Sequence, residues 1–163
     1  MLTLSLDELL AYTDEERDKW RGWLTGHRDA LTVQLQPTGR FATVNALIDH
    51  IFLVEARHLA RLQGLPVPDA SGMTSGEVDP LFDYGVSVRQ SLRQYLPTLN
   101  ADAASTVREF TVLSGTARMT PRKLLFHMAM HETRHWAQIA LGVRQAGLEP
   151  PGNHDLFYSR ALV

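Results

Sequence analysis

The sequence predicts an all-α fold, an antiparallel four-helix bundle with a crossover between the third and fourth helices. Four long segments carry apolar residues at helical spacing. Each of them has a capping residue at its start or a glycine or proline near its end. Most connections between them are short, as between antiparallel neighbours. At 163 residues, we expect a single domain spanning residues 1–163.

The first two helices follow from their start and stop signals. Ser5–Glu8 and Thr13–Glu16 both read as capping boxes, which predicts a short turn followed by a helix that ends near Gly26. The second helix is predicted from about Thr43 to Gln63, where apolar residues recur every three to four positions.

The second half of the chain contains two more predicted helices. The segment from Gly64 to Gly76 is rich in proline and glycine and is predicted to be a loop. Asp79-Pro80 reads as an N-cap with proline at the first helical position, and the third helix should stop before Pro97. Residues 107–115 are β-branched and polar, which indicates an extended segment. Thr120-Pro121 starts the fourth helix, of roughly 26 residues, which ends near Gly147.

Composition excludes several classes of function. Apolar residues make up 44% and the net charge is −2, with 14 of the 16 basic residues being scattered arginines, so we expect no nucleic-acid partner. No apolar run of about 18 residues is present, so we expect no membrane partner. The acidic N-terminal stretch MLTLSLDELL differs from a signal peptide, and we expect a cytoplasmic protein. Because the chain has no cysteine, any metal must be held by histidines and carboxylates, and any thiol must come from outside.

Three histidines share one face of the predicted fourth helix. His127, His131 and His135 are four residues apart and fall within an arc of roughly 80°. A lone histidine on such a face is usually a satisfied polar residue. Two histidines at this spacing direct both imidazoles to one point, which is typical of a metal clamp. We therefore predict that His131 and His135 bind a metal ion.

A third ligand is expected from a facing helix. His50 lies on the apolar face of the second helix and is the best candidate, while His58 is a reserve candidate whose simpler interpretation is a partly exposed polar residue. His127 is predicted to be a hydrogen-bonding neighbour of the ligands rather than a fourth ligand, because catalysis requires an open position. Gln138, on the same face, is predicted to donate a hydrogen bond to this group.

The stretch His131-Glu-Thr-Arg-His135 also matches the H-E-x-x-H pattern of zinc peptidases. In that pattern Glu132 would orient a nucleophile or accept a proton; the alternative is a surface salt bridge with Arg122 or Arg134. A peptidase usually takes its third ligand downstream of the motif and needs a strand edge for its substrate, and neither is evident. The peptidase is the weakest of the functional interpretations.

Two stretches carry a resemblance to a known family. DHIFLVEARHLARL (49–62) and HMAMHETRHWAQIALGVRQAGLEPP (127–151) combine a mid-helix histidine with H-x-x-x-H-x-x-x-H-x-x-Q and G-x-x-P-P, and they resemble the DinB/YfiT-like superfamily. The resemblance implies a four-helix bundle, often dimeric, that binds one divalent metal ion through His50, His131 and His135. Some members of this superfamily are thiol S-transferases or isomerases that use bacillithiol or mycothiol, and others are described as metal-dependent hydrolases. The resemblance therefore implies an activity of one of these kinds.

Three functional hypotheses remain. Three neutral imidazoles suit Zn²⁺, Ni²⁺, Fe²⁺ or Mn²⁺. The first hypothesis is a metal-dependent thiol S-transferase or hydrolase acting on a small molecule, in a homodimeric protein. The second is a non-catalytic metal-binding bundle that serves as a sensor or interaction module. The third is the H-E-x-x-H zinc peptidase.

Overall fold

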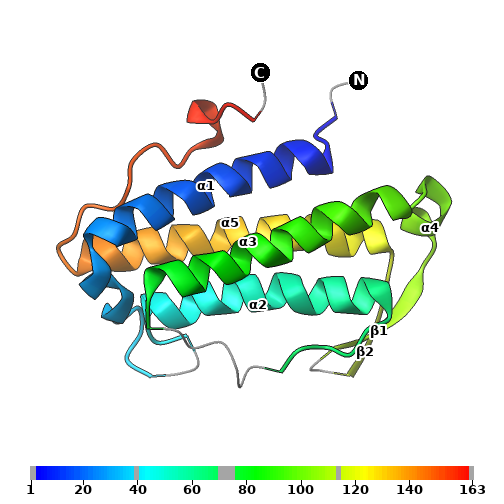
Figure 1. The fold of residues 1–163 in the computed structure, drawn as a ribbon, viewed down its shortest axis with the longest axis horizontal. Helices are drawn as coiled ribbons and strands as arrows, with labels where there is room; N and C mark the ends of the chain where they lie inside the picture. The colour runs from blue at the N-terminus through cyan, green and yellow to red at the C-terminus, as the bar shows by residue number, and fades with distance from the viewer. Residues whose placement is uncertain (1–2, 39–40, 70–75, 113–114, 162–163) are drawn as a thin grey trace.

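The computed structural model describes residues 3–38, 41–69, 76–112 and 115–161, and it is mostly helical (Figure 1). Within these residues there are five α-helices and one two-stranded antiparallel hairpin. The α-helices are α1 (Leu6–Gly26), α2 (Val44–Gln63), α3 (Val78–Tyr95), α4 (Ala101–Ser105) and α5 (Pro121–Gln145). The strands are β1 (Arg108–Val112) and β2 (Gly115–Met119), and short 3₁₀ helices span Arg28–Thr32, Leu96–Thr98 and Leu156–Tyr158. Residues 70–75 of the predicted loop and 113–114 of the predicted extended segment lie outside the described residues.

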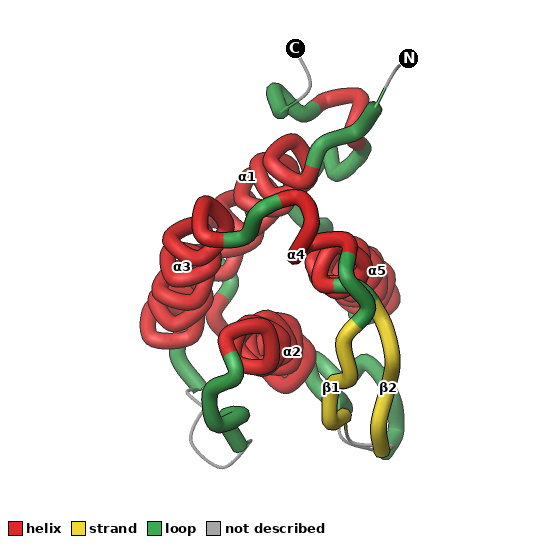
Figure 2. Tube along the Cα trace, turned by 90° about the vertical axis from the view of Figure 1, so that its right-hand side faces the viewer, coloured by secondary structure: helices red, strands yellow, loops and turns green. Residues whose placement is uncertain are grey.

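The four long helices surround a common core. Viewed along their axes, α1, α3, α2 and α5 follow one another around it (Figure 2), and each packs against the next. In Figure 1, α2 and α3 begin at the same end of the molecule, whereas α1 and α5 run the other way. Adjacent α2 and α3 are therefore parallel. The third long helix, α3, ends at the same end of the molecule at which α5 begins, so the chain does not cross back along the molecule between them. The expected crossover between the third and fourth long helices is therefore not found at this connection. The hairpin lies at that end, where the Arg61 side chain donates from Nε to the carbonyl oxygen of Thr111 (2.7 Å).

Capping signals predict most helix starts correctly. Ser5 and Glu8 form the predicted capping box of α1, Thr43 caps α2, and Thr120 caps α5 with Pro121 in its first turn. The second predicted capping box is wrong. Thr13 lies inside a continuous α1, where its hydroxyl donates to the carbonyl oxygen of Leu10 (3.1 Å) and so has its partner within the helix.

Two further differences concern the third helix and the segment between it and α5. The third helix begins at Val78 with Glu77 as its N-cap, so Pro80 lies in the first turn but not at the first position. The short α4 is capped by Asn100, whose side chain accepts from the backbone N–H of Ala103, and was not predicted. The expected extended segment is β1; its partner β2 carries no β-branched run to predict it.

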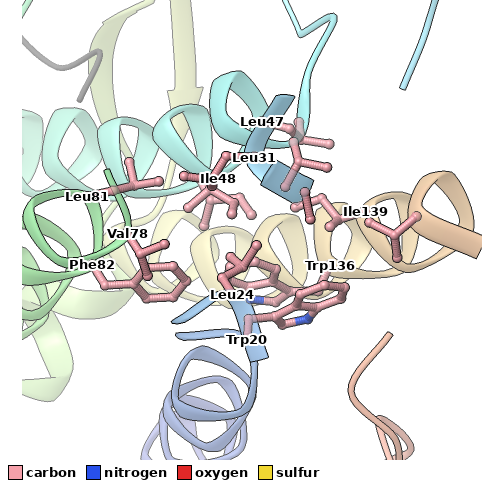
Figure 3. Close-up of a cluster of buried hydrophobic side chains, with 14 of the residues drawn as sticks. Trp20, Leu24, Leu31, Leu47, Ile48, Val78, Leu81, Phe82, Trp136 and Ile139 are labelled. Carbon is pink, nitrogen blue, oxygen red and sulfur yellow. The ribbon is translucent and has the colours of Figure 1, made fainter. Parts of the chain in front are cut away.

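A cluster of buried apolar side chains, drawn in Figure 3, contains several aromatic rings. The ring centroids of Trp20 and Trp136 lie 5.7 Å apart in a stacked pair, and the ring of Phe82 also stacks on Trp136, with centroids 6.3 Å apart. Gly85 allows the close approach of α3 to α2, because a Cβ at this position would meet the ring of Phe52 at 2.8 Å. None of the helices within the described ranges is both long and apolar enough to cross a membrane. The core thus fixes α2 against α5, the two helices that carry the candidate ligands.

Candidate metal centre

Three histidines from two helices meet at one point. The Nε2 atom of His131 lies 3.0 Å from that of His135, one turn further along α5, and 3.2 Å from that of His50 on α2. One ring nitrogen from each residue lies within 4.8 Å of the others. The structure therefore brings together the three residues that were predicted as ligands.

The spacing of these nitrogens fits a metal ion. Ligand nitrogens ~2.0–2.1 Å from a tetrahedral zinc ion lie about 3.3 Å apart, close to the two separations found here. A chain of imidazole–imidazole hydrogen bonds explains the arrangement less well, because the single Nε2 of His131 faces both neighbours and carries either one proton or one lone pair. The three side chains thus form a suitable donor set for one divalent ion.

Burial keeps these imidazoles in the form that binds metals. Burial lowers the pKa of His131 to about 2, with the neighbouring His135 and His50 adding to the effect. Burial also lowers the pKa of His135. Both rings are therefore neutral near pH 7, and metal binding does not have to displace a proton.

Gln138 fixes the orientation of one ligand. Its side-chain oxygen lies 2.5 Å from Nδ1 of His135. A hydrogen bond donated by Nδ1–H to this oxygen leaves Nε2 of His135 unprotonated and directed at the other two histidines. Gln138 therefore contacts the group as predicted, although as an acceptor rather than as a donor.

His127 and His58 lie beside the three-histidine group and outside it. The His127 ring is 5.6 Å from that of His131 and 5.5 Å from that of His58. His58 is half-buried, and burial together with nearby Arg61 lowers its pKa to about 4. His58 and His127 thus form a second pair of neutral imidazoles, next to the three-histidine group along the contact between α2 and α5. That His127 forms a hydrogen bond to a metal ligand stays a prediction.

We expect the metal-free protein to lose stability as the pH falls from about 7 to 5. Histidines in the unfolded chain take up protons below their ordinary pKa of about 6.5. His58 and His131 in the folded protein do not, because their pKa values are about 4 and 2, and those of His127 and His135 are also lowered. Asp49 acts in the opposite direction, because burial raises its pKa to about 6, but it is one group against four.

The measurement is urea-induced unfolding of chelator-treated protein at several pH values between about 7.5 and 5, and the urea concentration at the midpoint of unfolding reports the stability at each pH. Ordinary carboxylates titrate mainly below about pH 4.5 and contribute little in this range. The His131→Gln variant should show a shallower dependence than the wild type. A midpoint that is flat or rises on acidification would contradict the expectation.

Glu132, the acidic residue of the H-E-x-x-H stretch, faces the core and not the three nitrogens. Its carboxylate is 2% exposed and accepts two hydrogen bonds from Arg17, both at 2.7 Å, and one from Arg89 at 2.9 Å. The indole N–H of Trp136, one turn along α5, donates to the same carboxylate at 3.0 Å. The surface salt bridge with Arg122 or Arg134 that the sequence left open is therefore wrong.

These contacts belong to a buried ion-pair network. Glu55 of α2 also accepts hydrogen bonds from Arg17 and from Arg89, the latter at 2.8 Å from Nε, so four side chains connect four helices. Burial alone would raise the pKa of Glu55, but the two arginines outweigh it and hold that pKa below its ordinary value. Asp14 adds a further carboxylate for Arg89 at 2.5 Å. We call Arg17, Glu55, Arg89 and Glu132 the buried ion-pair network.

Sequence reasoning missed this network, although one signal was present. Arg17 follows Leu10 by seven residues and precedes Trp20 by three, which places a charge on the apolar face of α1. A charge at such a position requires a buried partner of opposite sign.

The fold and the site together define a helical protein with a three-histidine group suited to a divalent metal ion. The chain belongs to the DinB family: the model of that family matches residues 1–161, nearly the whole chain. This confirms the resemblance predicted from the two histidine-bearing stretches. No curated protein matches the chain at a significant level.

Proposed function

We propose that the protein binds one divalent metal ion through His50, His131 and His135 and acts as a metal-dependent thiol S-transferase or hydrolase on a small molecule. The observation that carries the proposal is the convergence of three histidine nitrogens from α2 and α5. Such an ion supplies positive charge that lowers the pKa of a water or a thiol and so provides a nucleophile near neutral pH. The all-histidine donor set is compatible with Zn²⁺, Ni²⁺, Fe²⁺ or Mn²⁺.

The residues around the three histidines support this proposal. Gln138 holds His135 in the tautomer that presents Nε2, and the ring of Phe41 lies 4.1 Å from that of His50, so one side of the group is screened by an apolar side chain. Among the described residues, the group contains no carboxylate that would offset the charge of an ion. Because the sequence has no cysteine, a thiol nucleophile has to be a cosubstrate of low molecular weight.

The proposal extends to the setting of the site. We infer a four-helix bundle of the DinB/YfiT type, a homodimeric state and a cytoplasmic location. The four long helices around one core support the first, and the family resemblance supports the second. The net charge of −2 and the scattered arginines favour a small-molecule substrate over nucleic acid, and we propose no membrane partner.

The test combines metal analysis with thiol consumption. Protein purified without chelator should contain about one divalent ion per chain. Metal-loaded protein should consume bacillithiol, mycothiol or glutathione in the presence of epoxides or chloroarenes, and the chelator-treated protein should not. Equal rates with and without metal would contradict the catalytic part of the proposal.

A non-catalytic metal-binding module is the alternative that the same experiment identifies. Protein that binds one ion per chain but stays inert towards every thiol and electrophile tested would favour a sensor or interaction function. Protein that binds no ion would remove both functions.

A further inference from the structure

A pocket of about 230 Å³ opens beside the three-histidine group, between the C-terminal half of α5 and the segment that leads into α2. His135 forms part of its wall. Four other lining side chains are apolar, and three are amides; they are Leu35, Phe41, Leu47, Leu141, Gln36, Gln138 and Gln145. The pocket is therefore next to the candidate metal ligands, and apart from His135 its lining side chains are either apolar or uncharged amides.

The described residues that line this pocket include no Asp, Glu, Lys or Arg. Of the charged residues on the same part of α5, Arg144 lines a different pocket, and Arg134 is exposed and does not line this one. A charged ligand entering the pocket would lose hydration without meeting an opposite charge from these walls, which is unfavourable. An uncharged ligand would place its apolar part against leucine and phenylalanine and its polar group against a glutamine amide.

The size of the pocket limits the ligand further. A cavity of roughly 150 Å³ holds one benzene molecule, whereas drug-sized ligands occupy roughly 300–1,000 Å³. Gly142 contributes to this limit, because a Cβ there would meet Cδ2 of Leu35 at 2.1 Å, so Leu35 packs directly on the α5 backbone. The pocket of about 230 Å³ thus suits a single ring with a short substituent.

We propose that this pocket is the substrate subsite of the metal centre and that it takes a small uncharged molecule, one ring or a short chain bearing an amide, carbonyl or hydroxyl group. The role of the pocket as a substrate subsite rests on the function proposed above, whereas its preference for uncharged ligands rests on the lining side chains alone. In a thiol transfer the pocket would hold the electrophile.

The experiment compares three probes of similar size: benzamide, benzoate and benzylammonium. Each is titrated into the full-length, chelator-treated protein near pH 7.5, and binding is followed by amide chemical shifts in two-dimensional NMR spectra. Benzamide and benzylammonium are also titrated into the zinc-loaded protein; benzoate is omitted there because a carboxylate binds zinc directly. We expect benzamide to shift the Gly142 and Gln145 amide signals and to bind at least about tenfold more tightly than either ion.

A single charge tests the location of the probe. The Gln145→Glu variant should bind benzylammonium several-fold more tightly than the wild type, since it adds a carboxylate to the wall. Gln90→Glu, which makes the same change on the exposed surface of α3, should leave all three affinities unchanged.

The outcomes separate this inference from the proposed function. Charged probes that bind as tightly as benzamide, signals that shift away from Gly142, or the absence of binding would each overturn the inference. None of these results depends on a metal ion in the chelator-treated protein. Failure of zinc to bind would instead remove the proposed function and leave the ligand preference of the pocket as measured.

Discussion

Replacing His131 by alanine is expected to reduce the metal content from about one ion per chain to below about a tenth. His131 is the ligand whose Nε2 lies beside both other nitrogens, at 3.0 and 3.2 Å, so its removal leaves His50 and His135 without the nitrogen between them. Loss of a residue that only orients a metal ligand typically weakens binding ~10–100-fold, and loss of a ligand should exceed this. Elemental analysis and a competition titration with a chromophoric chelator measure the change.

A second readout separates loss of the metal from loss of the fold. A ligand that binds only the folded protein raises its apparent stability. Added zinc should therefore raise the melting temperature of the wild type and leave that of His131→Ala unchanged. The matched control is His27→Ala, since His27 is exposed at the end of α1 and stacks on Trp23. That variant should keep both its metal content and its response to zinc.

The same measurement on His50→Ala tests the ligand from α2. We expect it to lose metal as His131→Ala does. Unchanged metal content in His50→Ala would remove His50 from the site and favour His58, which lies two turns further along α2. An unchanged content in His131→Ala would contradict the three-histidine site itself.

The three candidate ligands were predictable because helical geometry relates them directly. A spacing of four residues places His131 and His135 on one face of any α-helix, and His50 shared the apolar face of its own helix with residues expected in the core. The contact between α2 and α5 was also predictable, because a metal site shared by two helices requires their histidine-bearing faces to meet. The position of the group along the molecule was thus fixed by local pattern.

The environment of Glu132 was not predictable in the same way. Its angular position, at the edge of the histidine face, was compatible with solvent or with a buried partner. Its partners Arg17 and Arg89 lie 115 and 43 residues away in the sequence, and no local pattern relates them. The parallel arrangement of α2 and α3 was not predicted for a similar reason. Capping signals mark the residue at which a helix begins, but they do not show at which end of the molecule that residue lies.

Replacing Glu132 by alanine is expected to destabilise the fold by about 3–5 kcal/mol. The change removes one of two buried glutamates that face Arg17 and Arg89, and breaking a buried pair leaves a charge without a partner in a low-dielectric interior. Domains of this kind are stable by only about 5–15 kcal/mol, so the loss is a large fraction of the total. In thermal unfolding it corresponds to a fall of roughly 6–20 °C for a chain of this length.

Controls decide whether this effect comes from the buried ion-pair network. Glu149→Ala, which removes an exposed glutamate beyond α5, should change stability by less than about 0.5 kcal/mol. Arg17→Met should also destabilise the protein, since it leaves the carboxylates of Glu55 and Glu132 with one guanidinium fewer. A Glu132→Ala variant as stable as the wild type would show that the network contributes little to folding.

The same substitutions test the peptidase interpretation, because the two roles of Glu132 predict different results. A peptidase base would need to face a metal-activated water, and Glu132→Gln would then abolish the cleavage of casein or of a peptide library. In this structure the carboxylate is held by Arg17, Arg89 and Trp136, and it is not part of the group formed by the three histidine nitrogens. We therefore expect no Glu132-dependent cleavage, and one metal ion per chain in folded Glu132→Gln. Cleavage that disappears in Glu132→Gln while its metal is retained would instead assign this glutamate to catalysis.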